Sequence, residues 1–315
     1  MIELFAPVAE ACAISVPEEL RLPVALVGAG AIADVAHLPS YRKAGLEVVG
    51  ILDVNRERAG EVAARHGIGR VYADLDELLG DEAVAVVDVA VPASAQPAIC
   101  RRVIDSGRHM LGQKPFAPSS ALARELAELA ESRGVVLAVN QQLRYDEGIA
   151  AAHAMANLGW LGELTHLEIA VDIWTEWASW PWMLDLDELE VWNHSIHYHD
   201  AVRYFLGEPS RVFSIGGRTP GQRPQGETRT LTTYCFESGA TASVSAHHLN
   251  RWGDPSAVFR LEGSLGALRG SLGLLYDYPR GRPDTLALRS DVVPTDGWLP
   301  YPVTSRWIPD AFLGP

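Results

Sequence analysis

The stretch that decides the fold is PVALVGAGAIADVAHLPSYRKAG, residues 23–45. It runs from a short apolar segment through a loop of small residues into a segment with helical spacing. Gly28, Gly30 and Ala33 form the motif GxGxxA where the expected strand meets the expected helix. Gly28 permits a tight turn, Gly30 lets the backbone approach a pyrophosphate, and Ala33 allows close helix packing. The stretch therefore predicts the start of a dinucleotide-binding domain, with the helix N-terminus facing the phosphates.

The same alternation of short apolar runs and helical patterns continues to about Asn140. Expected strands cover 46–54, 83–92, 109–115 and 135–140, and expected helices cover 55–67, 96–107 and 119–134. This rhythm is typical of a parallel sheet with crossover helices. It predicts an α/β fold whose N-terminal part is a doubly wound Rossmann sheet of five or six strand–helix units.

Beyond Asn140 the pattern changes. Expected helices at 146–157 and 193–205 stand among alternating runs at 164–177, 211–217, 229–237, 240–248 and 256–263. Strands that repeat with Gly and Pro between them are typical of an open, mostly antiparallel sheet. We therefore expect an N-terminal extension over 1–22, a Rossmann domain over 23–142, and an α+β domain for substrate and oligomerisation over 143–315.

Composition narrows the class of protein. The 40 acidic residues outnumber the 26 basic ones and give a formal net charge of −14, which disfavours nucleic acid and anionic membranes as partners. The three cysteines form no CxxC pair, so neither a zinc site nor a disulfide framework is expected. Glu3 and Glu10 argue against a signal peptide, and no run approaches the ~20 apolar residues of a membrane span. We expect a soluble, cytoplasmic protein.

Asp53 ends the second expected strand, about 20 residues after the glycine loop, where a carboxylate can accept hydrogen bonds from ribose hydroxyls. A carboxylate there repels a 2′-phosphate, so NAD is expected in preference to NADP, although Arg56 and Arg58 soften this preference. The alternative is that Asp53 is a cap or turn residue before helix 55–67. The expected cofactor contacts are Gly28, Gly30, Ala31, Ile32, Asp53, Val54, Arg56, Val91, Pro92, Gln96, Gln113 and Lys114.

The run SGRHMLGQKP at 106–115, following VVDVAVP at 86–92, resembles the family of glucose-fructose oxidoreductase, inositol dehydrogenase and MocA. That family has a strand ending in Glu-Lys-Pro. Matching motifs extend from about Pro23 to Glu208 when GAGAIA, ILDVN, YADLDELL, AVNQQLRYD and HSIHYHDAVRYFLGEP are included. Their order along the chain makes the combination far more specific than any one of them.

The resemblance implies a Rossmann domain followed by an open-faced α+β domain, with substrate between the nicotinamide and the second domain's sheet. It implies oxidation or reduction of a secondary alcohol or carbonyl in sugars, cyclitols and related polyols. Lys114 matches the family's catalytic lysine, and His197 matches the histidine of its helix motif. A homo-oligomer, dimer or tetramer, through the C-terminal sheet is expected on the same ground.

The chemistry assigns each of these residues a role. Hydride transfer from a carbinol carbon requires removal of the hydroxyl proton, and a lysine can accept it if burial and a nearby positive charge lower its pKa. Lys114 follows a strand's C-terminal end, where open α/β sheets bind ligands, although a lysine before Pro115 is also compatible with a solvated loop. Asn193 and His197 are four residues apart and share a helix face, and His197 and Asp200 lie within one turn.

This chain departs from the family pattern at three positions. Gln113 stands where the family usually has Glu, Asn193 where it usually has Asp, and Gln96 where a histidine is common. Asn193 can orient a hydroxyl but cannot exchange a proton. The departures suit either a subgroup with its own substrate or an inactive relative.

Histidines and tryptophans cluster in the second half. His194, His197 and His199 point in different directions on a helix, so they predict pocket lining and not a metal site. Trp174, Trp177, Trp180, Trp182 and Trp192 can stack on a sugar or pack sheets and interfaces. The expected substrate contacts are Asn193, Arg144, Tyr145, Trp174 and Asp200, with an ion pair at the domain boundary as the alternative for Arg144 and Tyr145.

We predict NAD-dependent oxidation of a sugar or polyol hydroxyl, with Lys114 and His197 as the catalytic residues. A non-catalytic regulatory protein that binds dinucleotide or sugar is the second hypothesis, motivated by Asn193 and Gln113. A carbonyl reductase acting on a non-carbohydrate is the third. The sequence ends at RWIPDAFLGP, where related chains commonly continue into another helix, so this chain is expected to be either naturally short or truncated.

Overall fold

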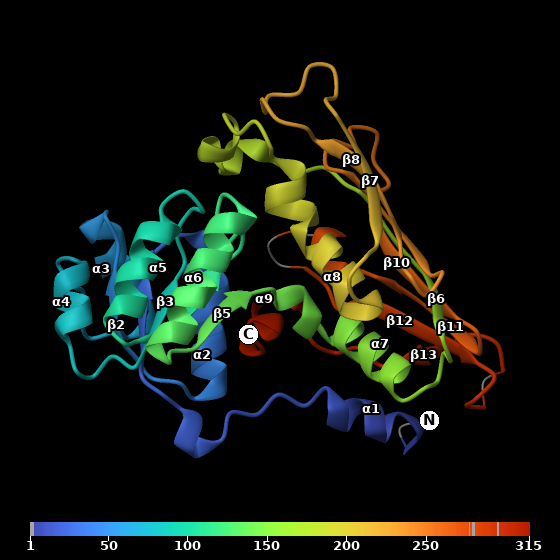
Figure 1. Cartoon of the computed structure of the whole chain (residues 1–315), viewed down its shortest axis with the longest axis horizontal. Helices are drawn as coiled ribbons and strands as arrows, with labels where there is room; N and C mark the ends of the chain where they lie inside the picture. The colour runs from blue at the N-terminus through green and yellow to red at the C-terminus, as the bar shows by residue number, and fades with distance from the viewer. Residues whose placement is uncertain (1–2, 277, 279–280, 295) are drawn as a thin grey trace. The chain divides into compact units, whose positions relative to one another are not determined.

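The computed structural model describes residues 3–276, 278, 281–294 and 296–315. The chain forms two compact units (Figure 1). Residues 14–142 together with 312–315 form the first, which we call the Rossmann unit. Residues 143–311, together with the described part of 1–13, form the second, which we call the sheet unit.

The Rossmann unit is built on a parallel sheet of five strands in the order β2-β1-β3-β4-β5. Its strands are β1 (Val24–Val27), β2 (Val48–Leu52), β3 (Val86–Val89), β4 (His109–Gln113) and β5 (Leu137–Asn140). The sheet is nearly continuous in apolar residues because helices cover both of its faces. The predicted doubly wound parallel sheet is confirmed.

The helices of the Rossmann unit separate into two layers. Its helices are η2 (Glu18–Leu20), the π-helical turn η3 (Ala33–His37), α2 (Leu38–Ala44), α3 (Arg56–His66), α4 (Leu75–Gly80), α5 (Gln96–Asp105) and α6 (Ser120–Arg133). One apolar core joins the sheet to α4, α5 and α6, and a second core joins it to η3, α2 and α3. The doubly wound arrangement follows directly from these two cores.

Local sequence explains where several of these helices begin and end. The side chains of Asn55, Asp74 and Ser119 accept hydrogen bonds from the first turns of α3, α4 and α6. Gly67 and Gly134 end α3 and α6 in the left-handed conformation that glycine adopts without strain. The cap of α3 is Asn55, so Asp53 remains available for another role.

The sheet unit contains eight strands in the order β13-β12-β11-β10-β6-β9-β8-β7. Its strands are β6 (Leu164–Asp172), β7 (Arg211–Gly217), β8 (Arg229–Cys235), β9 (Thr241–His247), β10 (Ser256–Gly263), β11 (Gly266–Ser271), β12 (Thr285–Ser290) and β13 (Leu299–Tyr301). All neighbours pair antiparallel except β6 and β9, which pair parallel. The predicted open, mostly antiparallel sheet is confirmed.

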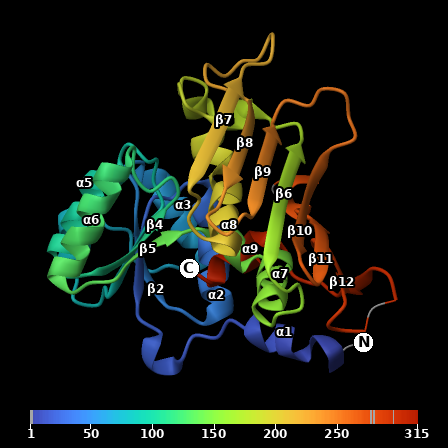
Figure 2. The same ribbon diagram turned by 45° about the vertical axis from the view of Figure 1, so that its right-hand side comes forward.

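Helices cover one face of this sheet. Figures 1 and 2 show α7 (Glu147–Asn157) and α8 (Ile196–Leu206) on the same side. His153 of α7 stacks on Tyr204 of α8 with ring centroids 3.7 Å apart, which ties the two helices together. The other helices of the unit are η1 (Glu3–Phe5), α1 (Ala6–Ala11), η5 (Trp177–Ser179), η6 (Pro181–Met183), η7 (Val191–Ser195), η8 (Gly273–Tyr276) and α9 (Trp307–Asp310). Two further 3-10 turns are η4 (Gln142–Tyr145) and η9 (Ala311–Leu313).

The N-terminal segment that the sequence suggests as an extension contributes to the core of the sheet unit. Phe5 is buried, with its ring 5.1 Å from that of Tyr301 and 6.2 Å from that of Trp160. Val8 on α1 is fully buried as well. Burying two apolar side chains stabilises the unit by roughly 3–6 kcal/mol, so residues 3–11 are held by the hydrophobic effect.

Within the described residues, none of the helices combines the length and apolar character that crossing a bilayer requires. Cys12, Cys100 and Cys235 are free thiols.

Two aspartates form a buried carboxyl pair in the sheet unit. Asp146 immediately precedes α7, and Asp284 Oδ1 accepts a hydrogen bond from Gly273 N at 2.5 Å. Burial, and after it the charge of Asp284, raises the pKa of Asp146 well above its ordinary value. Burial also raises the pKa of Asp284. Burial therefore favours a proton shared by the two carboxyl groups, because two charges cannot readily be kept together in a buried site.

Asp146→Asn is expected to remove most of the alkaline loss of stability of the sheet unit. A raised folded-state pKa contributes stability that is complete below the unfolded value near pH 4 and is lost as the pH rises through the folded value. Asparagine keeps a donor toward Asp284 and has no proton to lose. Urea unfolding at pH 5 and pH 8 should show the wild-type difference reduced by at least half. The exposed Asp185→Asn is the control, and an unchanged pH dependence in Asp146→Asn would contradict the shared proton.

Candidate active site

The glycine loop has the geometry that a pyrophosphate requires. Gly28 follows β1 with φ +107°, and a Cβ at this position would lie 2.4 Å from the carbonyl oxygen of Ala90. A Cβ on Gly30 would meet no atom within 4 Å, so the space next to it is open. Ala33 is fully buried where η3 begins. The first glycine is therefore required by the fold, and the second leaves room for a ligand.

Asp53 is hydrogen-bonded to the glycine loop, and its side chain is partly exposed. Its Oδ2 accepts a hydrogen bond from Ala29 N at 2.7 Å, and its Oδ1 accepts one from Asn55 N at 2.8 Å. Both bonds come from backbone, which leaves further acceptor capacity on the carboxylate. The position and remaining lone pairs suit a ribose diol at the end of β2.

The side chain of Gln96 binds the backbone of the segment Gln113–Pro115. The Gln96 side chain is fully buried, and its Nε2 donates to Gln113 O at 2.7 Å and to Pro115 O at 2.8 Å. Gln96 was expected to contact the cofactor, but both of its amide hydrogens are used in holding this segment. The structure therefore assigns Gln96 a supporting position beneath Lys114. The Lys114–Pro115 peptide bond is cis.

Gln113 was also expected at the cofactor, and it too is turned inward. Its Oε1 accepts a hydrogen bond from Lys114 N at 2.7 Å, and its Nε2 lies 2.8 Å from His37 Nε2. Lys114 itself is partly buried, and burial lowers its pKa to about 8. A substantial fraction of the amine is thus neutral near physiological pH, which a lysine needs to accept a proton.

The sequence did not predict the buried polar cluster that contacts Gln113. His37 Nδ1 lies 2.6 Å from Asp88 Oδ2, and Tyr41 Oη donates to the same oxygen at 2.6 Å. Asn140 Nδ2 lies 3.4 Å from His37 Nε2. A signal was present, because Asp88 interrupts the apolar run of β3 and a polar side chain inside such a strand needs a partner.

The remaining cofactor candidates line the surface of the Rossmann unit. Ala31, Val54, Arg56 and Pro92 are exposed, while Ile32 and Val91 are partly buried. Val54 points fully into solvent.

In the sheet unit, Asn193 and His197 lie on a composite helix. Val191–Ser195 forms a π-helical turn that continues into α8. Asn193 is buried, and its Nδ2 donates to Leu189 O at 3.2 Å. His197 is buried against Trp307, with ring centroids 5.4 Å apart and nearly perpendicular. The sequence predicted the helix but not its π turn. Such turns are frequent at functional sites.

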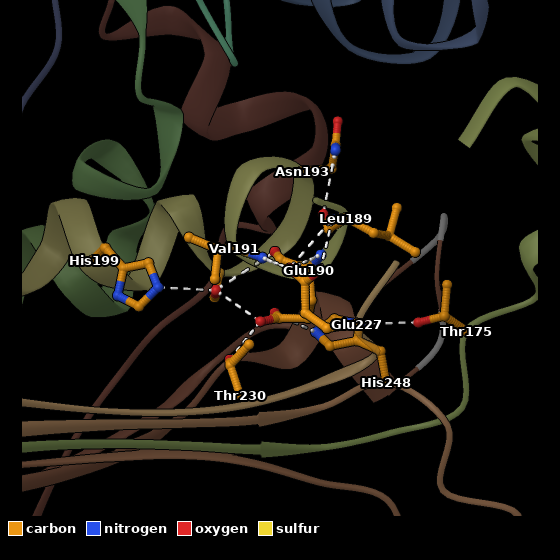
Figure 3. A network of polar contacts seen from close by, with 10 residues as sticks. Thr175, Leu189, Glu190, Val191, Asn193, His199, Glu227, Thr230 and His248 are labelled. Atoms are coloured by element: carbon orange, nitrogen blue, oxygen red, sulfur yellow. Dashed lines mark hydrogen bonds and ion pairs between the residues drawn. The ribbon is translucent and has the colours of Figure 1, made fainter. Parts of the chain in front are cut away.

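A carboxylate from a distant loop caps this helix. Glu227, just before β8, accepts hydrogen bonds from three successive backbone N–H groups, those of Leu189, Glu190 and Val191, at 3.0–3.2 Å (Figure 3). A carboxylate at a helix N-terminus satisfies donors that the helix cannot and complements its dipole. Glu227 therefore fixes the start of the helix that carries Asn193 and His197.

Glu190 links this helix to strand β8 by side-chain hydrogen bonds. Its Oε2 accepts from Ser195 Oγ at 2.9 Å and from Thr230 Oγ1 at 2.5 Å. Burial raises the pKa of Glu190 to about 7 and lowers that of His248 to about 3. Their closest atoms are 3.6 Å apart, and both pKa shifts favour the uncharged forms of the two side chains (Figure 3).

Glu227→Ala is expected to lower the free energy of unfolding of the sheet unit by about 2–4 kcal/mol, because it leaves several buried N–H donors unsatisfied. Glu227→Gln retains an acceptor and should lose less than half as much. Urea unfolding measures both, with the exposed Glu237→Ala as the control. Equal effects of alanine at 227 and 237 would show that the cap contributes nothing.

The other predicted substrate residues partly bind one another. Asp200 holds Arg144 in a bidentate ion pair, with both N–O distances at 2.6 Å. The guanidinium lies over the ring of Tyr204, and the bonded Asp200 raises the pKa of Arg144. This is the ion pair that the sequence left open as the alternative for Arg144, and it occupies Asp200 as well. Tyr145 and Trp174 are exposed, so both can meet a ligand.

The clustered histidines have separate surroundings. His199 lies 3.0 Å from Ser195 Oγ and 2.5 Å from Tyr234 Oη, and burial lowers its pKa to about 4. His194 packs edge-on against the buried Trp177 and lies beside His248. Among the residues that the structure describes, none of the His, Cys, Asp and Glu side chains form a group of three or more placed to hold a metal. Trp177 serves a small core, and Trp182 is exposed.

Comparison with known proteins adds to this geometry. A family model described as "Oxidoreductase family, NAD-binding Rossmann fold" matches residues 22–141. A second, described as "GFO/IDH/MocA C-terminal domain", matches residues 149–269. The two matches cover both units.

Individual relatives share less than a third of their residues with this chain in the two examples that follow. D-apiose dehydrogenase from Paraburkholderia graminis is 26% identical over 257 residues, which are 79% of this chain and 67% of the relative. 1,5-Anhydro-D-fructose reductase from Ensifer adhaerens is 28% identical over 254 residues, 78% of this chain and 74% of the relative. An oxidoreductase from Agrobacterium radiobacter, solved with NAD+, L-tartaric acid and magnesium, has a TM-score of 0.79 at 22% identity, covering 92% of this chain and 80% of that one. At this identity the last likeness concerns the fold.

Proposed function

The chain belongs to the GFO/IDH/MocA family of oxidoreductases with an NAD-binding Rossmann fold, and we propose that it transfers hydride between NAD and a secondary alcohol or carbonyl of a sugar, cyclitol or related polyol. The observation that carries this proposal is Lys114. It follows the C-terminal end of β4, the edge where open α/β sheets bind ligands, and burial lowers its pKa to about 8.

The residues of the Rossmann unit fit NAD. The tight turn at Gly28, the open space at Gly30 and the acceptor capacity of Asp53 match a pyrophosphate and an adenosine ribose. NAD, when bound, supplies the hydride acceptor. We further assign cofactor contacts to Ala31, Ile32, Val54, Arg56, Val91 and Pro92, which lie in the glycine loop or in the segments that follow β2 and β3.

Lys114 acts in this proposal as the group that takes the proton from the reacting hydroxyl and returns it in the reverse direction. His197 and Asn193 bind and orient that hydroxyl from the capped helix of the sheet unit. Tyr145 and Trp174 offer an exposed phenol and indole to the rest of the substrate. The ion pair joins Arg144 of η4 to Asp200 of α8, and in this proposal the two side chains contact substrate only through atoms that the pair does not use.

The substrate class rests on the two relatives named for D-apiose and 1,5-anhydro-D-fructose. The test is absorbance-monitored reduction of NAD by purified protein with aldoses, sugar acids, anhydrosugars and inositols. Turnover of at least one class supports the proposal. A folded protein that binds NADH but turns over no member of the panel favours instead a non-catalytic sensor, for which the non-titrating Asn193 is the structural argument.

Asp53→Asn is expected to lower the preference for NAD over NADP by about tenfold or more. The asparagine oxygen can still accept from Ala29 N, although the bond from Asn55 N is then lost, so the contact to the glycine loop is kept while the charge that repels a 2′-phosphate is removed. The measurement is the ratio of kcat/KM for the two coenzymes, or of their Kd values. Asp74→Asn removes the same charge at the cap of α4 and should leave the ratio unchanged. An unaltered ratio in Asp53→Asn would exclude Asp53 from coenzyme selection.

We also propose a homo-oligomer formed through the open face of the sheet unit. Phe213, Ile215, Leu231 and Val258 are exposed by 40–66%, and the strand register places them on this face. An apolar face of this kind is typical of a surface that another protein covers. The free thiols suit a reducing compartment such as the cytoplasm, which we propose as the location.

A further inference from the structure

A continuous line of buried side chains runs from the interior of the Rossmann unit to the backbone of Lys114. It begins at Asp88 in β3, passes through His37 at the end of the π-helical turn, and reaches Gln113 at the end of β4. Asp88 and His37 are at most 1% exposed and Gln113 is 6% exposed. The other groups that face His37 are Tyr41, Asn140 and Phe312. None of the cofactor or substrate roles above uses His37 or Asp88.

The direction of each hydrogen bond in this line follows from its last member. Lys114 N can only donate, so the atom of Gln113 that faces it at 2.7 Å is the amide oxygen. The Gln113 Nε2 hydrogens therefore point at His37, 2.8 Å away. His37 Nε2 must accept, and a second amide nitrogen, that of Asn140, approaches the same atom.

An imidazole that accepts at Nε2 and binds a partner at Nδ1 is neutral, with its proton on Nδ1. That proton is directed at Asp88 Oδ2, 2.6 Å away. A doubly protonated His37 would place an N–H against the Gln113 amide, and turning that amide over would place its NH2 against Lys114 N. Only one arrangement satisfies all the donors.

We propose that Asp88, His37 and Gln113 are positioning residues that hold Lys114 in its reactive place, with Asp88 selecting the His37 tautomer and Gln113 passing the constraint to the Lys114 backbone. Gln96 secures the carbonyls of the same segment, so the segment is held at N–H and C=O alike. This inference rests on the proposed role of Lys114. A segment fixed in this way keeps the amine at a constant depth of burial.

Gln113→Met removes both side-chain bonds at nearly equal volume and is the main test. We expect kcat to fall 10- to 100-fold with the Kd of NADH changed less than threefold. Gln113→Glu still accepts from Lys114 N and should retain at least a third of kcat. Tyr41→Phe, which removes one hydrogen bond at the far end of the line, is the matched control and should lower Tm with kcat nearly unchanged.

Two spectroscopic measurements test the hydrogen-bonded line from Asp88 to Lys114 without any substrate. Nitrogen-15 histidine NMR of the full chain, with His37 assigned from His37→Asn, should show a neutral ring protonated at Nδ1, and a doubly protonated ring in Gln113→Glu. The chain has only two lysines, Lys43 and Lys114. Carbon-13 reductive methylation therefore gives one Lys114 signal, assigned against Lys43→Arg, whose titration should move upward by at least half a pH unit in Gln113→Met.

The outcomes separate the two proposals. Absence of turnover with any substrate, together with the expected His37 tautomer and the shifted Lys114 titration, would end the proposed function and leave the positioning line standing. A wild-type His37 protonated at Nε2, or a Gln113→Met variant with wild-type kcat and an unmoved Lys114 titration, would overturn the positioning line whatever the activity.

Discussion

Replacement of Lys114 with methionine is expected to lower kcat by about 10³-fold while NADH binds with nearly unchanged affinity. Proton transfer by a positioned side chain is worth about 10²–10⁴-fold, and methionine fills the same space without a titrating group. The NADH affinity should persist because the glycine loop and Asp53 make their contacts independently of the amine. Single-turnover absorbance measures the first quantity, and fluorescence titration with NADH measures the second.

The pH dependence of the wild type sharpens this expectation. A pKa near 8 means that the neutral amine becomes the major form above that pH. The kcat/KM for alcohol oxidation should therefore rise with pH and level off above about 8. The kcat/KM for carbonyl reduction, which needs the protonated amine, should instead fall as the pH rises through about 8. Lys43→Met is the control, since Lys43 is the other lysine of the chain and lies exposed on α2. Turnover above a tenth of wild type in Lys114→Met would remove Lys114 from the mechanism.

The fold was predictable because its signals are local. The loop GAGAIA sits between an apolar run and a helical pattern, and each later strand of the Rossmann sheet is a short apolar run followed by a helix with a recognisable end. In the sheet unit, the alternation along β8 and β9 corresponds to their alternating burial. Strand order was not predictable in the same way, because the parallel pairing of β6 with β9 joins segments distant in sequence.

The candidate site was only partly predictable. Lys114, Asp53 and the glycine loop are recognisable by position in a motif. His37 and Glu227 act through partners far away in the chain, and single residues of these types are common in loops and helices. Gln96 was assigned to the cofactor because its loop was expected to pass near the nicotinamide, and Gln113 because it precedes Lys114 in the motif, yet the amides of both face inward. Side-chain direction at a strand end depends on tertiary packing, which a linear pattern does not contain.

Alanine substitutions at the two glycines of the loop are expected to affect stability and NADH affinity differently. Gly28→Ala places a Cβ 2.4 Å from the Ala90 carbonyl oxygen at a φ of +107°, which together should lower the free energy of unfolding of the Rossmann unit by about 3 kcal/mol. The loop must move to relieve the contact, and NADH affinity should fall at least 100-fold.

Gly30→Ala is the matched variant with the opposite balance. Its Cβ meets no protein atom within 4 Å and its φ lies outside the left-handed region, so stability should change by less than about 0.5 kcal/mol. The new methyl group enters the space through which the pyrophosphate approaches the backbone, so NADH affinity should still fall about tenfold or more. Urea unfolding and NADH titration on both variants give the comparison. If Gly30→Ala bound NADH as the wild type does, the pyrophosphate would not lie against this loop, and the cofactor assignment of residues 28–33 would have to be abandoned.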